Sequence, residues 1–118
     1  MNRGMRLSLM SVSVVLGVTA LLTAGQSHAD SSLAAKIADA DVGYGEYLSG
    51  ECVTCHQKSG QSRGIPAIAG LEAETFVSIM TAYRNKELEN KVMQMVAGRL
   101  DDEQIISLAA YFSKLPSK

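Results

Sequence analysis

The sequence predicts an all-α fold. Apolar residues recur at intervals of three and four positions in the segments 71–85 and 101–112, which is the spacing of one helix face. No segment alternates apolar and polar residues clearly enough to predict a strand. Three glycines and a proline gather in the segment 57–70, where they predict a loop between helices.

The first 29 residues predict a secretory signal peptide. Arg3 and Arg6 form a basic start, and the segment 7–22 is apolar and carries no charge. Ser27 and Ala29 then offer the small residues of a cleavage site. The apolar segment has about 16 residues, whereas a membrane-spanning helix needs about 20. We therefore expect cleavage after Ala29, export to the periplasm and no membrane association of the mature chain. An uncleaved anchor is the competing interpretation.

The mature chain would form one small domain. It has 89 residues, with nine basic and twelve acidic side chains and so a net charge of −3. A chain of this length lies near the lower limit at which a single apolar core is stable. Because no basic block is present, nucleic acid is not expected as a partner. Residues 30–41 are polar and alanine-rich and predict a flexible lead-in to a domain that spans residues 42–118.

Two helices are expected in the first two thirds of this domain. A short helix around residues 43–51 leads into a pair of cysteines, and a longer helix covers residues 71–85. The charged segment 85–90 that follows predicts a solvated connection. The apolar residues that define these helices are Tyr44, Tyr47, Leu48, Phe76, Ile79, Met80 and Tyr83.

The last helix has the clearest start and stop signals. Asp101 is a favourable N-cap, and Gln104 three residues later completes a capping box. Leu108 and Phe112 then lie on one face of the helix. Pro116 follows at a point where a helix cannot continue.

Cys52, Cys55 and His56 form a C-x-x-C-H motif, the attachment sequence of c-type haem. Two thiols on one helical turn can each bond to a vinyl group of the same haem, and the adjacent imidazole reaches the iron from the same side. Chance would produce this arrangement on the order of once in several thousand chains with two cysteines and one histidine. The motif therefore predicts one haem c, bound covalently through Cys52 and Cys55.

Other uses of the paired cysteines fit less well. A thioredoxin-like redox pair requires a βαβ setting, which the sequence does not predict. Structural zinc requires four protein ligands, and the mature chain has no further cysteine or histidine. A disulfide framework is also excluded, since the haem uses both thiols.

Four segments carry a family resemblance: C-V-T-C-H at 52–56, G-I-P-A-I-A-G at 64–70, V-M-Q-M-V-A-G-R-L at 92–100 and D-D-E-Q-I-I-S-L-A-A-Y-F at 101–112. With them, the chain from residue 43 to residue 115 resembles a class I cytochrome c. This resemblance implies three to four short helices around one covalently attached haem, so that residues 42–118 are a cytochrome c domain.

The resemblance also implies that the first and last helices of the domain cross. Gly45 would allow the close approach near Tyr111, and Tyr47 or Leu48 would pack against Leu108. A glycine inside a short helix costs stability, so it needs a packing reason of this kind.

The expected iron ligands are His56 and, by the resemblance, Met93. The only other histidine leaves with the signal peptide, so the sixth ligand is a methionine, lysine, tyrosine, water or nothing. In class I cytochromes c the ligand methionine stands seven residues before the residue that opens the last helix segment, which here pairs Met93 with Leu100. The competing role of Met93 is core packing. The other methionines of the mature chain are Met80, on an apolar helix face, and Met95.

The resemblance places two further residues around the haem. The carbonyl of Pro66 would accept a hydrogen bond from the ring of His56, which fixes the tautomer, and Ile68 would pack on the haem face. An ordinary rigid turn is the simpler interpretation of Pro66 and is compatible with this role. Tyr83 would donate a hydrogen bond near the methionine sulfur or a propionate, or serve as a core residue.

With His56 and Met93 on the iron, no position is open for a substrate, so single-electron transfer is expected rather than catalysis by this chain. The segments 64–70, 92–100 and 108–112 are most similar to the cytochrome subunit of flavocytochrome c sulfide dehydrogenase, in which a flavoprotein subunit oxidises sulfide and passes electrons to the cytochrome. The alternative is a freely diffusing periplasmic carrier between a dehydrogenase or quinol-oxidising complex and a terminal oxidase or reductase, with other periplasmic redox proteins as partners. A gas-binding or peroxidase-like haem protein is a third hypothesis, which requires an open sixth position.

Overall fold

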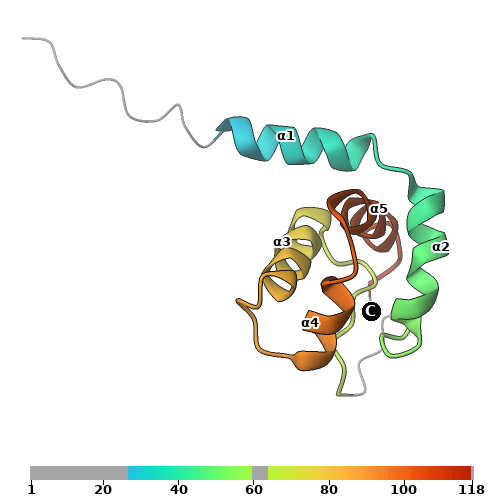
Figure 1. Ribbon diagram of the computed structural model, residues 1–118. Helices are drawn as coiled ribbons and strands as arrows, with labels where there is room; N and C mark the ends of the chain where they lie inside the picture. The colour runs from blue at the N-terminus through green and yellow to red at the C-terminus, as the bar shows by residue number, and fades with distance from the viewer. Residues whose placement is uncertain (1–26, 60–63, 118) are drawn as a thin grey trace, which may run out of the picture.

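A computed structural model describes residues 27–59 and 64–117, with side chains from Ser32 onward. These residues form five helices and no strand, which confirms the all-α prediction (Figure 1). The helices are α1 (Ser27–Ala38), α2 (Val42–Val53), α3 (Ala73–Arg84), α4 (Lys91–Ala97) and α5 (Asp102–Phe112).

Helices α2 and α5 cross at Gly45, as the resemblance implied. A Cβ atom at this position would collide with the backbone carbonyl oxygen of Ser107 and would lie 3.0 Å from the Cβ of Tyr111. The two backbones can therefore approach this closely only because residue 45 has no side chain. Of the two candidates for the contact with α5, Leu48 packs against the core, whereas Tyr47 is 80% exposed.

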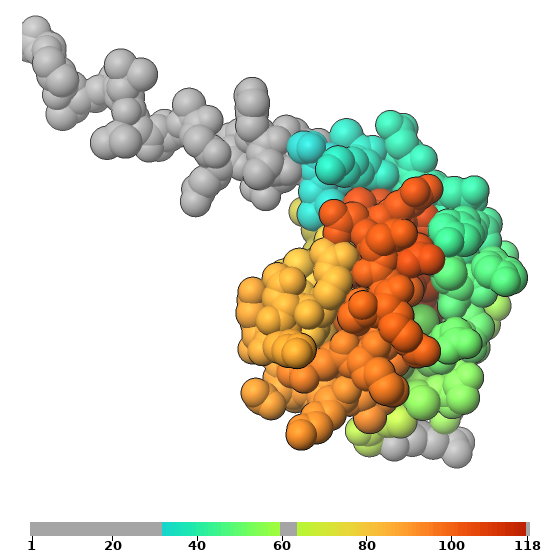
Figure 2. All heavy atoms as spheres, viewed as in Figure 1, coloured from blue at the N-terminus to red at the C-terminus, as the bar shows by residue number. Residues whose placement is uncertain are grey.

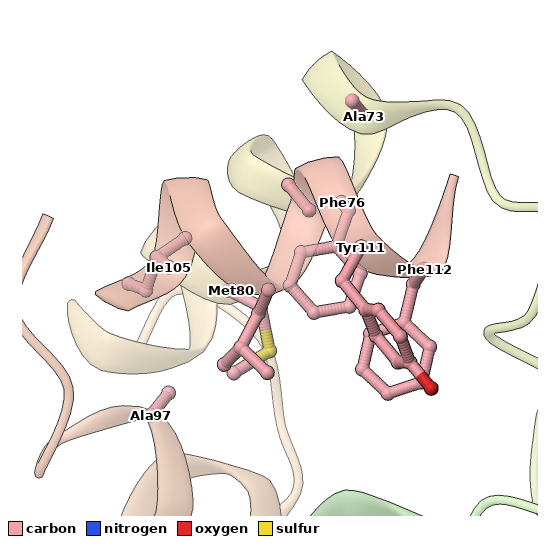
Figure 3. Packing of buried hydrophobic residues seen from close by; sticks show 9 residues of the cluster. Ala73, Phe76, Met80, Ala97, Ile105, Tyr111 and Phe112 are labelled. Carbon is pink, nitrogen blue, oxygen red and sulfur yellow. The ribbon is translucent and has the colours of Figure 1, made fainter. Parts of the chain in front are cut away.

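The apolar core lies between α5 and α3. Phe112, Ile105 and Leu108 of α5 are almost completely buried, and they meet Phe76 and Met80 of α3 (Figure 3). The rings of Phe76 and Phe112 stack with their centroids 5.7 Å apart. Met80 is 5% exposed, so it fills the core as expected of a methionine on an apolar helix face.

The predicted capping box of α5 is present. The side chain of Asp101 accepts a hydrogen bond of 2.8 Å from the backbone N–H of Gln104, and the side chain of Gln104 accepts one of 3.0 Å from the backbone N–H of Asp101. Gln104 also donates to the hydroxyl of Tyr44 over 3.1 Å. The start of α5 is therefore tied to α2 as well as capped.

The chain passes from α3 to α4 through residues 85–90. Lys86 adopts a left-handed backbone with φ of 63°, and the N–H of Glu87 donates to the carbonyl of Ala82 over 2.8 Å. This is the Schellman ending of a helix, which satisfies the last carbonyls of α3. Asn90 then caps α4, which the sequence did not predict as a helix, by accepting a hydrogen bond of 3.0 Å from the N–H of Met93.

Helix α1 covers residues 30–38 of the segment 30–41, for which the sequence predicted a flexible lead-in and no helix. The helix lies against α5 and α3 (Figure 1). Its residues explain why it forms, because alanine favours a helix and Leu33 and Ile37 stand four positions apart on one side. Both side chains are half-buried, and Ile37 packs against the core.

Residues 1–26 of the expected signal peptide lie outside the described residues. Cleavage after Ala29 would fall within the first turn of α1. Among the residues that the structure describes, no helix is long and apolar enough to cross a bilayer.

We predict that Gly45→Ala lowers the free energy of unfolding by about 1–3 kcal/mol, because the added methyl group forces α2 away from the backbone of α5. Gly50→Ala is the matched control: it lies on the same helix, and nothing stands within 4 Å of its added Cβ. This control should gain about 0.5–1 kcal/mol from better helix propensity. Denaturant unfolding of the haem-loaded proteins measures both, and equal stability of the two variants would contradict the close crossing.

A second prediction concerns Glu72, whose carboxylate caps α3. It accepts hydrogen bonds from the backbone N–H groups of Glu74 (2.9 Å) and Thr75 (2.7 Å), and these bonds lower the pKa of Glu72. Since the folded-state pKa is the lower one, the cap stabilises the fold above the ordinary glutamate pKa and is lost as pH falls through the depressed value. As the pH falls below the ordinary glutamate pKa, the free energy of unfolding of Glu72→Gln should therefore decrease less than that of the parent protein.

Urea midpoints of the haem-loaded protein between about pH 6 and pH 3 test this cap. Glu74→Gln removes one carboxylate from the same helical turn and is the control for the change in charge. A parent-like slope in Glu72→Gln would contradict the role of its carboxylate as a cap.

Candidate functional site

The C-x-x-C-H motif lies where α2 ends. The helix finishes at Val53, and the backbone N–H groups of Cys55 and His56 both donate to the carbonyl of Cys52, over 3.2 Å and 2.8 Å. One closing turn of helix therefore carries both thiols and the imidazole. Neither thiol forms a disulfide, and Cys52 is half-buried whereas Cys55 is exposed.

The electrostatics of Cys52 are unlike those of a redox-active cysteine. Burial raises the pKa of its thiol, and the carboxylate of the neighbouring Glu51 raises it further. Thioredoxin-like pairs work through a thiolate with a lowered pKa. Together with the all-α fold, this raised pKa argues against a thiol–disulfide exchange role for the motif.

The imidazole of His56 is held by the carbonyl of Pro66. Its Nδ1 atom lies 2.7 Å from that oxygen, which is the hydrogen bond that the resemblance implied. A proline carbonyl can only accept, so Nδ1 carries the proton and donates. The other ring nitrogen, Nε2, is then left with a free lone pair, which is the form of histidine that binds a metal.

The segment that presents this carbonyl is only partly packed. Pro66 is exposed, whereas Ile68 is half-buried and packs against the core, and Ala69 is 5% exposed. Gly64 and Gly70 have φ values of 85° and 74°, so the segment begins and ends with left-handed turns that favour glycine.

Met93 lies in the first turn of α4, half-buried against the core. The other two methionines occupy different surroundings: Met80 is enclosed in the core at 5% exposure, and Met95 is 61% exposed. Tyr83 also packs against the core, as expected of a core tyrosine.

Lys58, two residues after the motif, makes contacts that the sequence did not reveal. Its ammonium group lies 3.8 Å from the carboxylate of Glu46 on α2 and 5.7 Å from the centroid of the Tyr111 ring on α5. Both partners lie far from it along the chain, so no spacing rule could have found them. These contacts fasten the chain beyond the motif to the crossing of α2 and α5.

The sequence model of the family described as cytochrome c matches residues 40–116, which is more than half of the chain. The chain belongs to the cytochrome c family. A search of the curated proteins found no match to it. The match covers α2 to α5 and begins after the end of α1.

The residues of this cytochrome fit one covalent haem c. Cys52 and Cys55 are free and stand on one turn, and His56 keeps Nε2 available through its bond to Pro66. Within the described residues, α2 and α4 do not pack against each other, although both contribute to the same face of the molecule (Figure 2). The protein carries one haem c, bound through the two cysteines, and acts as an electron carrier.

One groove lies away from this site. It is an open hollow of about 400 Å³ between α1, α3 and α5, lined in part by Leu33, Val77 and Ile105. Arg84 and Asp102 form an ion pair of 2.7 Å beside it. None of the predicted site residues lines this groove, so it has no part in holding the haem.

Proposed function

We propose that this cytochrome is a periplasmic single-electron carrier whose haem iron is held by His56 and Met93. The observation that carries the proposal is the 2.7 Å hydrogen bond between Nδ1 of His56 and the carbonyl of Pro66. It orients the ring and leaves Nε2 as the donor atom. Haem c, when bound, supplies one reversible electron change at its iron.

The placement of the methionines supports Met93 as the second ligand. Met93 is half-buried on α4, and in the described part of the chain this helix does not pack on α2, which carries the haem-attachment motif. Met80 is enclosed among Phe76, Phe112 and other core residues, and Met95 is mainly exposed. A methionine and a histidine together leave no open position for a substrate, which favours electron transfer.

We infer that the partner is the flavoprotein subunit of a sulfide dehydrogenase, with this cytochrome as its electron-accepting subunit. The resemblance of the segments 64–70, 92–100 and 108–112 supports this partner. Exposed apolar residues around Met93 support a docking role: Val92 is 60% exposed, Met95 61% and Leu88 38%. Val92 and Met95 stand three residues apart on α4, and Gln94 donates to the carbonyl of Leu88 over 2.8 Å, so the three belong to one surface.

The periplasm is the proposed compartment because the first 29 residues have the charge and hydropathy pattern of a secretory signal.

The ligation predicts a clear effect of Met93→Ala. The reduced parent should not bind carbon monoxide at neutral pH, whereas the reduced variant should bind it, because removal of the thioether opens a coordination position. Met95→Ala is the matched control on the same helix and should behave as the parent does. Visible absorbance before and after addition of carbon monoxide measures its binding to the parent and to both variants. Carbon monoxide binding by the parent would contradict the proposal and favour a gas-binding protein.

The partner is tested on the native protein from its host. We expect the cytochrome to co-purify with a flavoprotein, seen by flavin absorbance, and its haem to be reduced when sulfide is added to the complex. A haem monomer that sulfide does not reduce at a catalysed rate would contradict the subunit role. That result would favour the freely diffusing carrier, whose encounters are short-lived and sensitive to salt.

A further inference from the structure

The carbonyl that orients His56 lies at the exposed end of a segment that becomes buried toward Gly70. Pro66 and Ala67 are exposed, Ile68 is half-buried against the core, and Ala69 is buried. A single hydrogen bond to an exposed carbonyl would be loose if that carbonyl could drift. Contacts at the Gly70 end of the segment limit this drift.

The first such contact joins the segment to the end of α5. The backbone N–H of Gly70 donates to the carbonyl of Phe112 over 2.8 Å, and Phe112 itself is completely buried. The N–H of Leu71 donates to the carbonyl of Ile68 over 3.3 Å, which closes a turn around Gly70. The segment is thus hydrogen-bonded to one of the most deeply buried residues of the core.

The second contact comes from the residues after α5. The chain turns back beyond Phe112, where the N–H of Leu115 donates to the Phe112 carbonyl over 3.1 Å and the Leu115 side chain packs against the core. Ser117 then lies directly over Gly70: a Cβ atom added to Gly70 would be 2.6 Å from the Cβ of Ser117 and 2.8 Å from its backbone nitrogen. Pro116 restricts the backbone just before this contact.

We propose that residues 113–117 are a brace that positions the haem-ligating histidine. Ser117 of the brace packs against Gly70 and keeps the segment 66–70 where Gly70 donates to the carbonyl of Phe112. This position keeps the Pro66 carbonyl within hydrogen-bond distance of Nδ1 of His56. Gly70, Leu115 and Ser117 are positioning residues, since they act on the histidine only through Pro66. This inference rests on the proposed ligation by His56.

The chemical consequence concerns the electron affinity of the site. A carbonyl that accepts the Nδ1 proton makes the imidazole a more basic ligand, and a more basic ligand favours the oxidised iron. If the brace is loosened, the hydrogen bond opens more often. The Nδ1 proton then exchanges faster with water, and the reduction potential rises.

The test substitutes Gly70→Ala in the haem-loaded protein. The added Cβ collides with Ser117 and is strained at a φ of 74°, so the brace or the loop must move. We expect exchange of the His56 Nδ1 proton, followed by proton NMR, to be faster by about tenfold, together with a higher reduction potential.

Gly64→Ala is the matched control. Gly64 has a comparable left-handed φ of 85° on the other side of Pro66, but nothing lies within 4 Å of its added Cβ. It shares the backbone strain without touching the brace, so its exchange rate and potential should match those of the parent. An equal change in both glycine variants would overturn the proposal, because strain alone would then account for it.

Leu115→Ala is the second variant, and it tests the role of the brace if Gly70→Ala does not fold. It removes the apolar side chain that anchors the brace and leaves the loop sequence intact. Faster Nδ1 exchange and a higher potential are expected again. A variant that loses stability while the exchange rate and potential stay at the parent's values would overturn the brace, since its role would then be structural only.

Failure of the ligation itself has a different signature. In the oxidised parent, the ring protons of His56 should carry paramagnetic shifts before any substitution is made. Their absence would overturn the ligation on which this inference rests, whereas shifted protons with unchanged exchange in the variants would overturn the brace alone.

Discussion

The close crossing of α2 and α5 at Gly45 is the constraint on which the site depends. Backbone meets backbone there, since a Cβ at Gly45 would collide with the carbonyl oxygen of Ser107. The crossing fixes where the last turn of α2 lies relative to the core, and that turn carries both cysteines and His56. Lys58 continues the same attachment beyond the motif, through Glu46 on α2 and Tyr111 on α5. A small domain gains rigidity in this way without a large core.

Three separate parts of the chain complete the site, and each is fastened to α5 or to the core. The turn at the end of α2 supplies the thiols and the imidazole, and the segment 66–70 supplies the carbonyl that orients the imidazole. In the proposed ligation helix α4 supplies Met93, whose backbone N–H donates to the side chain of Asn90. Because α5 contacts both α2 and α3, it is the element that relates these parts to one another. A haem site held in this way suits electron transfer, which proceeds best when the site changes little between its two states.

The sequence predicted the parts of this structure that local chemistry determines. The C-x-x-C-H motif identified the haem turn, and Asp101 with Gln104 located the start of α5, because both depend on residues a few positions apart. Family resemblance supplied the Pro66 hydrogen bond and the Gly45 crossing, which connect distant residues. Helix α4 was missed because seven residues are too few to display a period, and α1 was taken for a flexible lead-in because its apolar side is narrow. The contacts of Lys58 and Ser117 depend on tertiary packing, so no local pattern could reveal them.

The most direct test of the account is the environment of the methionines in the reduced native protein. Protein labelled with 13C in the methionine methyl groups should show one methyl signal displaced far upfield by the haem ring current, and that signal should disappear in Met93→Leu. The methyl groups of Met80 and Met95 should stay near ordinary positions, one in the core and one largely exposed. A spectrum with no displaced methyl signal, or with a displaced signal that belongs to Met80 or Met95, would contradict the assignment of Met93 and with it the His–Met electron carrier.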